Sequence, residues 1–274
     1  MIERIIENVR SNTPLIHCIT NYVTVNDVAN VLLACGASPI MADDINEAAE
    51  ITSICSGLDI NIGTLNTRTI EAMIKAGKKA NELGHITVLD PVGAGASKLR
   101  TDTAFELLKE IRFSVIRGNI SEIKSLYQGS STSNGVDANV SDRITEANLE
   151  ETISFAKELS KKTKAVIAIT GAIDIIADEN KAYVIQNGHP IMSKITGTGC
   201  MLTGIIAAYC AANPSQILEA TKAAVICEGL AGEKAYEKMQ ATNGYTSTFR
   251  MYLIDYIGEM TDQMIREGMK VEIR

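Results

Sequence analysis

A glycine-rich turn at the start of a helical pattern is the feature of this sequence with the clearest chemical potential. The segment ITGTGC (195–200) leads into a run of small and apolar residues. Gly197 and Gly199 would let the backbone approach a ligand closely, and the free N–H groups of a first helical turn favour an anion such as a phosphoryl group. The alternative is a tight turn that serves only to pack the helix. We also expect this position to lower the pKa of the Cys200 thiol.

Two acidic residues after apolar runs suggest a metal site. Asp90 begins the segment DPVGAGAS, and Glu122 begins the helical pattern after RGNIS. Magnesium in proteins is held by one or two carboxylates and several waters, so these side chains could share one ion. Without a metal, DPVGAGAS would be a flexible turn and Glu122 would complement the dipole of its helix. Lys98 does not complete a phosphate loop, because the spacing GxxxxGK[ST] is absent.

Hydrogen-bonding residues are unusually frequent in the apolar block PLIHCITNYVTVND (14–27). Asn21 and the backbone of Val23 could present polar groups to a small heterocycle. Met41, after the run SPIMA, could form an adaptable apolar wall. The alternative is that Asn21 or Thr24 simply caps the helix that follows.

Further polar residues and glycines stand where other apolar runs end. Gly63 follows LDINI, Arg117 follows FSVI, and Thr170 and Gly171 follow AVIAI. Each could serve only to turn the chain. Ligands of an open parallel sheet bind beyond the carboxyl ends of its strands, so together these residues predict a phosphate and metal site at one edge.

The elements that must position these residues alternate between short β-branched runs and longer helical patterns. Runs that are apolar on both faces, as buried parallel strands are, stand at 38–42, 58–62, 86–89, 113–116 and 165–169. Helical patterns stand near 24–35, 67–83, 101–111, 121–126 and 146–161. This alternation predicts an α/β fold with a central, mostly parallel sheet flanked by helices.

The rest of the chain adds a hairpin and a helical end to this pattern. The runs Ile173–Ala177 and Lys181–Gln186 predict a hairpin on one edge of the sheet. From Gly197 onward we expect a helical C-terminal third in three segments. The polar stretch 128–142 is the one candidate linker. A boundary there would divide the strands of one sheet, so we expect a surface loop or a flap over the site within a single domain, 1–274.

Charge and composition exclude several kinds of partner. The net charge of −7 and the scattered Lys and Arg residues argue against nucleic acid and an anionic membrane surface. No apolar stretch is long enough to cross a bilayer and the N-terminus lacks a secretory layout, so we expect a cytoplasmic protein. Six Cys residues without a CxxC pair predict reduced, mostly buried thiols. The three His residues lack metal-binding spacing, and we expect His17 to be a hydrogen-bonded core residue.

Several of these segments together resemble the hydroxyethylthiazole kinase family, within the ribokinase-like superfamily. The matching segments are PLIHCITNYVTVNDVANVLLACGASPIMA (14–42), DPVGAGAS (90–97), VIRGNISEI (115–123), AITGAIDIIAD (168–178) and TGTGCMLTG (196–204). Their order and spacing cover almost the whole chain. The N-terminal block is the specific part, because the GTGC turn is shared with hydroxymethylpyrimidine kinases and other relatives.

The resemblance implies a ribokinase-like fold and a defined activity. The reaction would be the ATP- and Mg²⁺-dependent phosphorylation of the hydroxyl of 4-methyl-5-(2-hydroxyethyl)thiazole, in thiamine salvage. The resemblance also implies a homotrimer, with the thiazole pocket at a subunit interface and ATP bound to a single subunit.

Roles for individual residues follow from the same resemblance. The residues that would line the thiazole pocket are Asn21, Val23, Met41, Gly63 and Gly197. Those that would bind ATP are Arg117, Thr170 and Gly171. Those that would organise Mg²⁺ are Asp90 and Glu122. Cys200, in one catalytic turn with Gly197 and Gly199, would face the substrate hydroxyl where many ribokinase-like kinases place an Asp as general base.

Three other functions compete with this one. A hydroxymethylpyrimidine-type kinase should open with a GSDxxGGAG-like segment, which is replaced here by IHCITNYVT. A non-catalytic binding protein of the same fold would have no need to keep Asp90, Glu122, Arg117 and the GTGC turn together. An NAD-linked Rossmann enzyme would need a GxGxxG fingerprint and its acidic partner, which are absent.

Overall fold

The computed structural model describes residues 4–128 and 144–274, so the predicted loop 128–142 lies, apart from its first residue, outside the described residues. Within these ranges one nine-stranded sheet runs in the order β2-β1-β3-β4-β5-β6-β7-β8-β9. Its strands are β1 (Leu15–Ile19), β2 (Ser38–Met41), β3 (Gly57–Asn61), β4 (Ile86–Asp90), β5 (Val115–Gly118), β6 (Val166–Ile169), β7 (Asp174–Ala177), β8 (Ala182–Ile185) and β9 (Val271–Ile273). Strands β1 to β6 are parallel, and the last three pair in antiparallel fashion. The predicted mostly parallel α/β sheet is confirmed.

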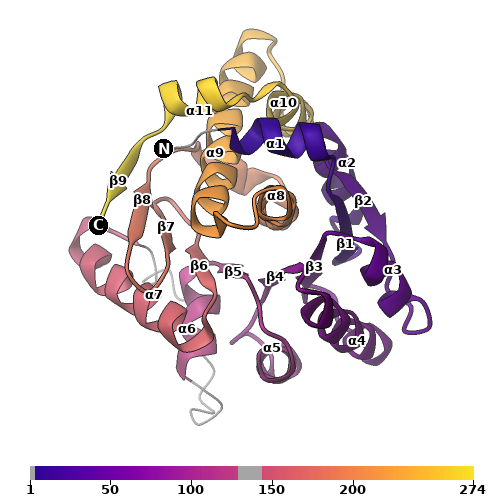
Figure 1. The fold of residues 1–274 in the computed structure, drawn as a ribbon. Coiled ribbons are helices and arrows are strands. Elements are labelled where there is room, and N and C mark those ends of the chain that lie inside the picture. Colours follow the sequence, from indigo (N-terminus) through magenta and orange to yellow (C-terminus); the bar gives the residue numbers. More distant parts are fainter. Residues whose placement is uncertain (1–3, 129–143) are drawn as a thin grey trace.

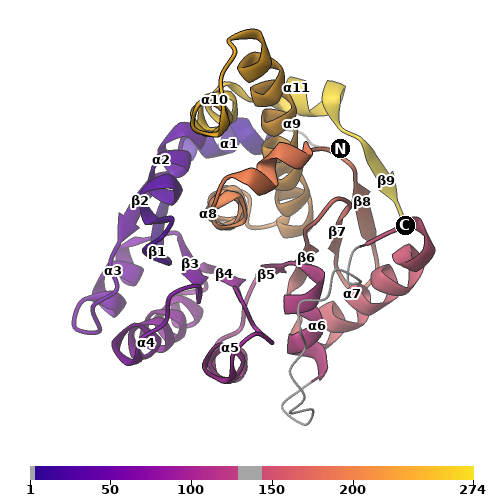
Figure 2. The same cartoon turned by 180° about the vertical axis from the view of Figure 1, so that it is seen from behind.

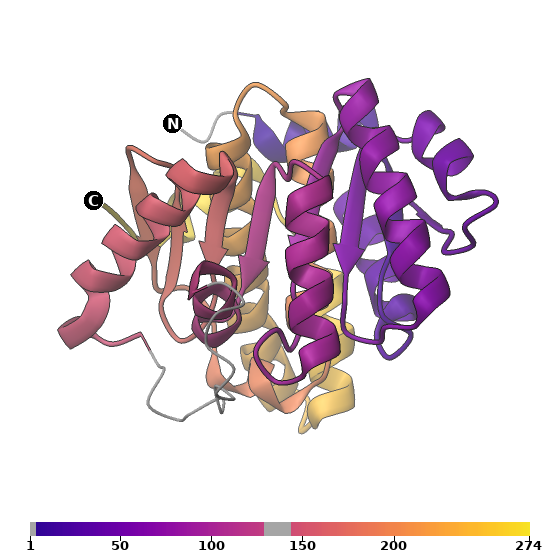
Figure 3. The ribbon, with the colours of Figure 1, turned by 90° about the horizontal axis from the view of Figure 1, so that it is seen from below.

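Helices lie on both sides of this sheet (Figure 1). On one side are α1 (Ile5–Asn12), α2 (Val25–Cys35), α8 (Thr198–Ala212), α9 (Ile217–Ala241), α10 (Thr246–Glu259) and α11 (Asp262–Gly268). On the other are α3 (Ala48–Ile54), α4 (Thr67–Leu83), α5 (Lys98–Glu110), α6 (Ile120–Gln128) and α7 (Leu149–Thr163), most of which stand in front of the strands in Figure 3. Short 3₁₀ turns, η1 (Glu146–Asn148) and η2 (Pro190–Lys194), precede α7 and α8. No helix of the described ranges is long and apolar enough to cross a membrane.

The sequence predicted most of these elements but missed the short ones β1, α3 and β9, and it did not separate α11 from α10. The predicted helical C-terminal third is confirmed by α8 to α11, except that β9 returns to the sheet and pairs with β8. A three-residue strand carries no period that a sequence pattern could show, and the open edge of β8 is what orders it. The predicted hairpin of β7 and β8 is confirmed, although β9 covers its outer edge.

Polar side chains of β1 are accommodated in the core by local hydrogen bonds. His17 is fully buried, with Nδ1 2.9 Å from Thr52 Oγ1 and Nε2 2.6 Å from the Ala42 carbonyl. Burial lowers its pKa, so the ring is neutral and structural as predicted. All six Cys residues are free thiols, and five are buried, whereas Cys200 is half-buried.

Helix α8 runs through the middle of the molecule, between the sheet and the other helices of its side (Figures 1 and 2). Every residue from Met201 to Cys210 is buried, as expected of a helix that is apolar on all sides. Gly204 lets α2 approach closely, since a Cβ there would lie 3.3 Å from Val28 Cγ1. This packing fixes the N-terminus of α8 relative to the strand ends.

The strand order changes direction between β1 and β3. Helix α2 leads from β1 to β2 on one side, whereas the chain then returns to β3 on the other side of β1. In open α/β sheets such a switch point leaves a crevice at the carboxyl ends of the strands, where ligands bind. The fold therefore places a binding site after β1 and β3.

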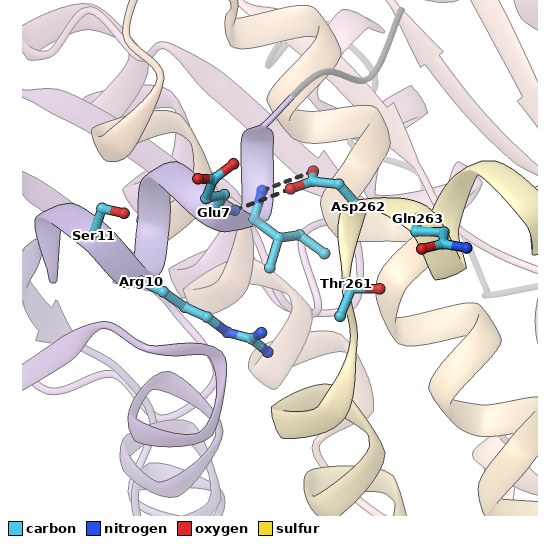
Figure 4. Close-up of a pocket in the computed structure, with 7 residues that line it drawn as sticks. Glu7, Arg10, Ser11, Thr261, Asp262 and Gln263 are labelled. Atoms are coloured by element: carbon cyan, nitrogen blue, oxygen red, sulfur yellow. Dashed lines mark hydrogen bonds between the residues drawn. The ribbon is translucent and has the colours of Figure 1, made fainter.

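A separate pocket of about 340 Å³ lies between α1 and the start of α11 (Figure 4). The Asp262 carboxylate accepts the N–H groups of Ile6 and Glu7, both at 3.0 Å. Arg10 donates to two backbone carbonyls at the end of α10. Because these charged groups already have partners within the chain, we interpret this pocket as a structural joint.

Replacing Asp262 with Ala should destabilise the fold at this joint. The carboxylate satisfies free N–H groups at the start of α1, and the loss of such a cap costs about 1 kcal/mol of unfolding free energy. Chemical denaturation should show the loss for Asp262→Ala and none for Gln263→Ala, its exposed neighbour. Equal stability of the two variants would contradict a stabilising role of Asp262 at the contact between α1 and α11.

Candidate active site

Polar residues at the ends of neighbouring strands converge against the N-terminus of α8. Asn61 and Asp90 are the paired last residues of β3 and β4. Arg117, in β5, lies with Nη1 3.4 Å from Asp90 Oδ2 and donates from Nη2 to Thr170 Oγ1 at 2.6 Å. The structure thus brings together three residues for which the sequence predicted roles in metal and ATP binding.

The two oxygens of the Asp90 carboxylate have different surroundings. Oδ2 accepts from Asn61 Nδ2 at 2.8 Å and from Thr203 Oγ1 at 2.9 Å, besides facing Arg117. Oδ1 is buried and has no hydrogen-bond partner within residues 4–128 and 144–274. Burial raises the pKa of Asp90 to about 6, although the Arg117 charge lowers it, and the charge of Glu122 raises it further. The two oxygens of this carboxylate therefore differ, since only Oδ2 is held by hydrogen bonds.

A chain of side-chain amides joins the switch point to α8. Gly63 N–H donates to Asn61 Oδ1 at 2.9 Å, which turns Asn61 Nδ2 toward Asp90 and the Cys200 sulfur, 3.3 Å away. Asn21 Nδ2 donates to Asn61 Oδ1 at 3.0 Å and to Cys200 Sγ at 3.1 Å. Asn21, Gly63 and Cys200, predicted near the substrate, therefore share one network.

The prediction that the Cys200 thiol has a lowered pKa is wrong. Its pKa is raised, first by burial and then by the nearby charge of Asp90. Hydrogen bonds from Asn21 and the Arg117 charge act in the opposite direction without prevailing. The helix N-terminus suggested a thiolate from the sequence, but desolvation outweighs it. At neutral pH, Cys200 is a thiol whose sulfur accepts amide hydrogens.

The two glycines of the turn lie in close contact with side chains of neighbouring elements. A Cβ on Gly199 would lie 2.4 Å from Arg117 Nη1. Gly197 has φ +92°, in the left-handed region, and a Cβ there would lie 2.7 Å from Thr24 Cγ2. Asn21 Oδ1 accepts from the Thr24 N–H at 3.2 Å and its hydroxyl at 3.1 Å. Asn21 thus orders the start of α2 and also reaches Cys200, whereas its contact with a heterocycle stays a prediction.

Glu122 is held at the start of α6 by hydrogen bonds to both of its carboxylate oxygens, while its role toward magnesium stays a prediction. Its Oε2 accepts the Asn119 N–H at 2.8 Å, and Asn119 Oδ1 accepts the Glu122 N–H at 2.9 Å, which is a reciprocal capping box. Its Oε1 accepts the Gly93 N–H at 2.9 Å. The carboxylate is thus fixed close enough to Asp90 to influence its pKa.

The carboxylates at the strand ends fit magnesium better than a metal that needs a full set of protein ligands. Across residues 4–128 and 144–274, no three His, Cys, Asp or Glu side chains group so as to hold a metal. Asp90 nevertheless offers a buried, unpartnered oxygen. Magnesium accepts one or two carboxylates and completes its shell with water and phosphate oxygens. The donor set at this edge therefore suits it.

The other predicted residues lie at the margin of this network. Val23 is 57% exposed, beside Tyr22, which is 78% exposed. Met41 ends the edge strand β2 and is half-buried. Gly171 is exposed, and its N–H donates to Asp174 Oδ1 at 2.8 Å. Within one subunit these residues border the site without entering its hydrogen-bond network.

Sequence reasoning gave no role to several residues of the site. Asn61 ended a predicted strand, but only the structure shows that it bonds three site residues. Thr203 stands four residues after Gly199, so helical spacing alone could have placed both on one face of α8. Arg100 Nη2 donates to the Gly63 carbonyl at 2.7 Å, across a distance in sequence that no pattern reveals.

Two buried acids lie behind Arg117. Glu228 of α9 is 5% exposed, its Oε1 has no hydrogen-bond partner, and burial raises its pKa from 4.5 to about 8 against the lowering effect of Arg117. Burial likewise raises the pKa of Asp174 to about 7, and its hydrogen bond from Gly171 lowers it only in part. Both groups therefore retain protons at pH values at which an exposed carboxyl group would lose them.

The comparisons with known proteins agree with one another. Residues 6–263 match the model of the hydroxyethylthiazole kinase family. A curated protein of Clostridium acetobutylicum named hydroxyethylthiazole kinase is 59% identical over 272 residues, which cover 99% of each chain. The solved structure of a hydroxyethylthiazole kinase protein from Pyrococcus horikoshii OT3 has a TM-score of 0.88 and 36% identity, covering 100% of this chain and 98% of that one. A pyridoxal kinase from Staphylococcus aureus, in complex with AMP-PCP and pyridoxal, has a TM-score of 0.55 at 15% identity, covers 79% of this chain and 87% of its own, and shows the fold alone. The predicted ribokinase-like fold is confirmed.

Glu228→Gln should make the stability of the protein less dependent on pH. Because the folded-state pKa of Glu228 is raised to about 8, its contribution to stability is complete below its unfolded pKa and is lost as pH rises through the folded value. The variant should therefore melt at a temperature similar to wild type near pH 4.5, and by about pH 9 it should melt several degrees higher than wild type. Glu237→Gln, at an exposed position of the same helix, is the control. If the melting temperatures of Glu228→Gln and wild type differ by the same amount at every pH between 4.5 and 9, the raised pKa of Glu228 would be contradicted.

Proposed function

The chain belongs to the hydroxyethylthiazole kinase family and is a phosphotransferase of that family, and we propose that its site transfers the γ-phosphoryl group of ATP to the hydroxyl of 4-methyl-5-(2-hydroxyethyl)thiazole. The product would enter thiamine salvage. One observation supports this most: Asp90, Arg117 and Cys200 converge where the glycine turn opens α8. A phosphate-transferring enzyme needs a metal carboxylate, a cation and free N–H groups in one place.

Backbone and cationic groups would carry the phosphates. The free N–H groups from Gly197 to Cys200, at the positive end of α8, would bind the transferring phosphoryl group. Arg117 lies against Gly199 and would balance charge on the phosphate oxygens. Thr170, which accepts from Arg117, and the neighbouring Gly171 would border the bound ATP.

Asp90 and Glu122 would hold magnesium through its waters. Asp90 would use Oδ1, the oxygen without a partner, and Glu122 would act from its fixed position at the start of α6. When bound, the ion neutralises charge on the phosphates as the transferring group develops its transition state.

The thiazole alcohol would lie on the switch-point side of the turn. The residues proposed to line its pocket are Asn21, Val23, Met41, Gly63 and Gly197. The exposed apolar side chains of Tyr22 and Val23 would be covered by a second subunit. We therefore propose a homotrimer with this pocket at a subunit interface, and a cytoplasmic setting in which six free thiols remain reduced.

A coupled ADP-release assay tests the proposed reaction directly. Release of ADP with the thiazole alcohol, and little release with hydroxymethylpyrimidine, would support it. Release only with the pyrimidine would favour a pyrimidine kinase. Binding of the thiazole alcohol without any ADP release would mean a non-catalytic binding protein.

Cys200→Ser should retain substantial activity. Phosphoryl transfer has a loose transition state, so positioning and charge matter more than removal of a proton from the hydroxyl. General-base help is worth about 10²–10⁴-fold where it operates, so we expect kcat to fall by less than the lower limit of that range. Steady-state kinetics would measure it, with Cys210→Ser, on the same helix, as a control for the exchange itself. Near-complete loss of activity in a folded Cys200→Ser variant would make the thiol a required base.

Asp90→Asn should raise the magnesium requirement. The substitution keeps the shape of the side chain but removes the charge that would hold the ion through water, and such partners are worth about 10–100-fold in metal affinity. Titration of activity with Mg²⁺ should show a higher half-saturating concentration. Asp102→Asn, at an exposed position of α5, should behave like wild type. An unchanged titration for Asp90→Asn would remove Asp90 from the metal site.

A further inference from the structure

Three donors from three different elements face a single oxygen of Asp90. Asn61 at the end of β3 lies 2.8 Å from Oδ2, Thr203 of α8 lies 2.9 Å from it, and Arg117 of β5 lies 3.4 Å from it. No donor of the part of the chain that the structure describes reaches Oδ1, although this atom is also buried. The final torsion of an Asp side chain is broad and roughly two-fold, so these donors, and not the backbone, determine which oxygen faces the site.

We propose that Thr203 and Asn61 are positioning residues, which hold one oxygen of Asp90 so that the other is presented to the metal ion and phosphates. The inference rests on the proposed function, in which Asp90 serves the metal. Neither residue needs to touch a substrate for this role. Arg117 is the weaker holder, because it is farther from Oδ2 and is shared with Thr170.

Thr203 links Asp90 to the catalytic turn. Its side chain is fully buried, and Oγ1 also lies 3.0 Å from the carbonyl of Gly199, one helical turn earlier. A shift of α8 along its axis would therefore move Asp90 as well. This contact keeps the distance between the N–H groups of the turn and the Asp90 carboxylate constant.

Asn61 links Asp90 to the acceptor side. Its Oδ1 accepts from Gly63 and Asn21, while its Nδ2 reaches Asp90 and Cys200. With all its polar atoms engaged and 1% of its surface exposed, it has one possible orientation. Loss of this amide should disturb both the metal carboxylate and the thiazole pocket, whereas loss of the Thr203 hydroxyl should disturb the carboxylate alone.

The test compares Thr203→Val, which has the same shape without the hydroxyl, with Thr203→Ser, which keeps it. Binding of Mn²⁺ in the presence of a non-hydrolysable ATP analogue, followed by electron paramagnetic resonance, reports on the metal site without turnover. We expect Thr203→Val to weaken Mn²⁺ binding by about 10–100-fold, to lower kcat, and to leave the KM for the thiazole alcohol unchanged. Thr203→Ser should have the Mn²⁺ binding and the kcat of the wild-type protein. Thr221→Val, which removes a buried helix hydroxyl of α9 far from the site, should match wild type.

Two results would overturn the proposal. One is wild-type Mn²⁺ binding by Thr203→Val, and the other is equal impairment of Thr203→Ser and Thr203→Val, which would mean that packing and not the hydroxyl matters. If Thr203→Val does not fold, Asn61→Ala provides the test, since it should weaken Mn²⁺ binding and raise the KM together. Absence of ADP release by the wild-type chain would refute the proposed function, while the Mn²⁺ measurements would still decide this inference.

Discussion

The burial of the Asp90 carboxylate is the constraint on which the site depends. A charged group with no exposed surface is tolerated only where donors and an opposite charge compensate for lost water. Here those partners come from β3, β5 and α8, so satisfying one carboxylate fixes the strand ends and the central helix against each other. The same contacts leave one oxygen free. The arrangement that stabilises the buried carboxylate is therefore also the one that leaves Oδ1 for the proposed magnesium ion.

The contacts of Asp90 also determine where Arg117, the first turn of α8 and Cys200 lie relative to one another. The Arg117 guanidinium lies against Gly199, so the cation and the first turn of α8 stand at the same point, where the proposed reaction needs both. Cys200 stands where a base would be expected, yet burial and Asp90 raise its pKa. Its sulfur accepts hydrogen bonds from Asn21 and Asn61, which suits a residue that shapes the acceptor side. The backbone and the charged groups are thus better placed than the thiol to promote transfer.

The sequence predicted the α/β fold because buried strands such as β4 and β6 are apolar on both faces. It also predicted which edge of the sheet would carry the candidate site, because polar residues follow those strands. It could not predict β9, whose three residues are ordered only by the edge of β8. It gave the wrong direction for the pKa of Cys200, since the desolvation of a side chain is not visible in its neighbours along the chain. Asn61 and Thr203 gained roles only from tertiary contacts, which join residues 29 and 113 positions away from Asp90.

We expect both substrates to meet at the start of α8. A crystal structure with the thiazole alcohol, magnesium and a non-hydrolysable ATP analogue would show where each of them binds. The terminal phosphate should lie at the N–H groups of Gly197 to Cys200, with the hydroxyl of the thiazole alcohol in line with it and magnesium facing Asp90 Oδ1. A terminal phosphate bound away from this turn, or magnesium on the side of Asp90 Oδ2, would contradict this arrangement.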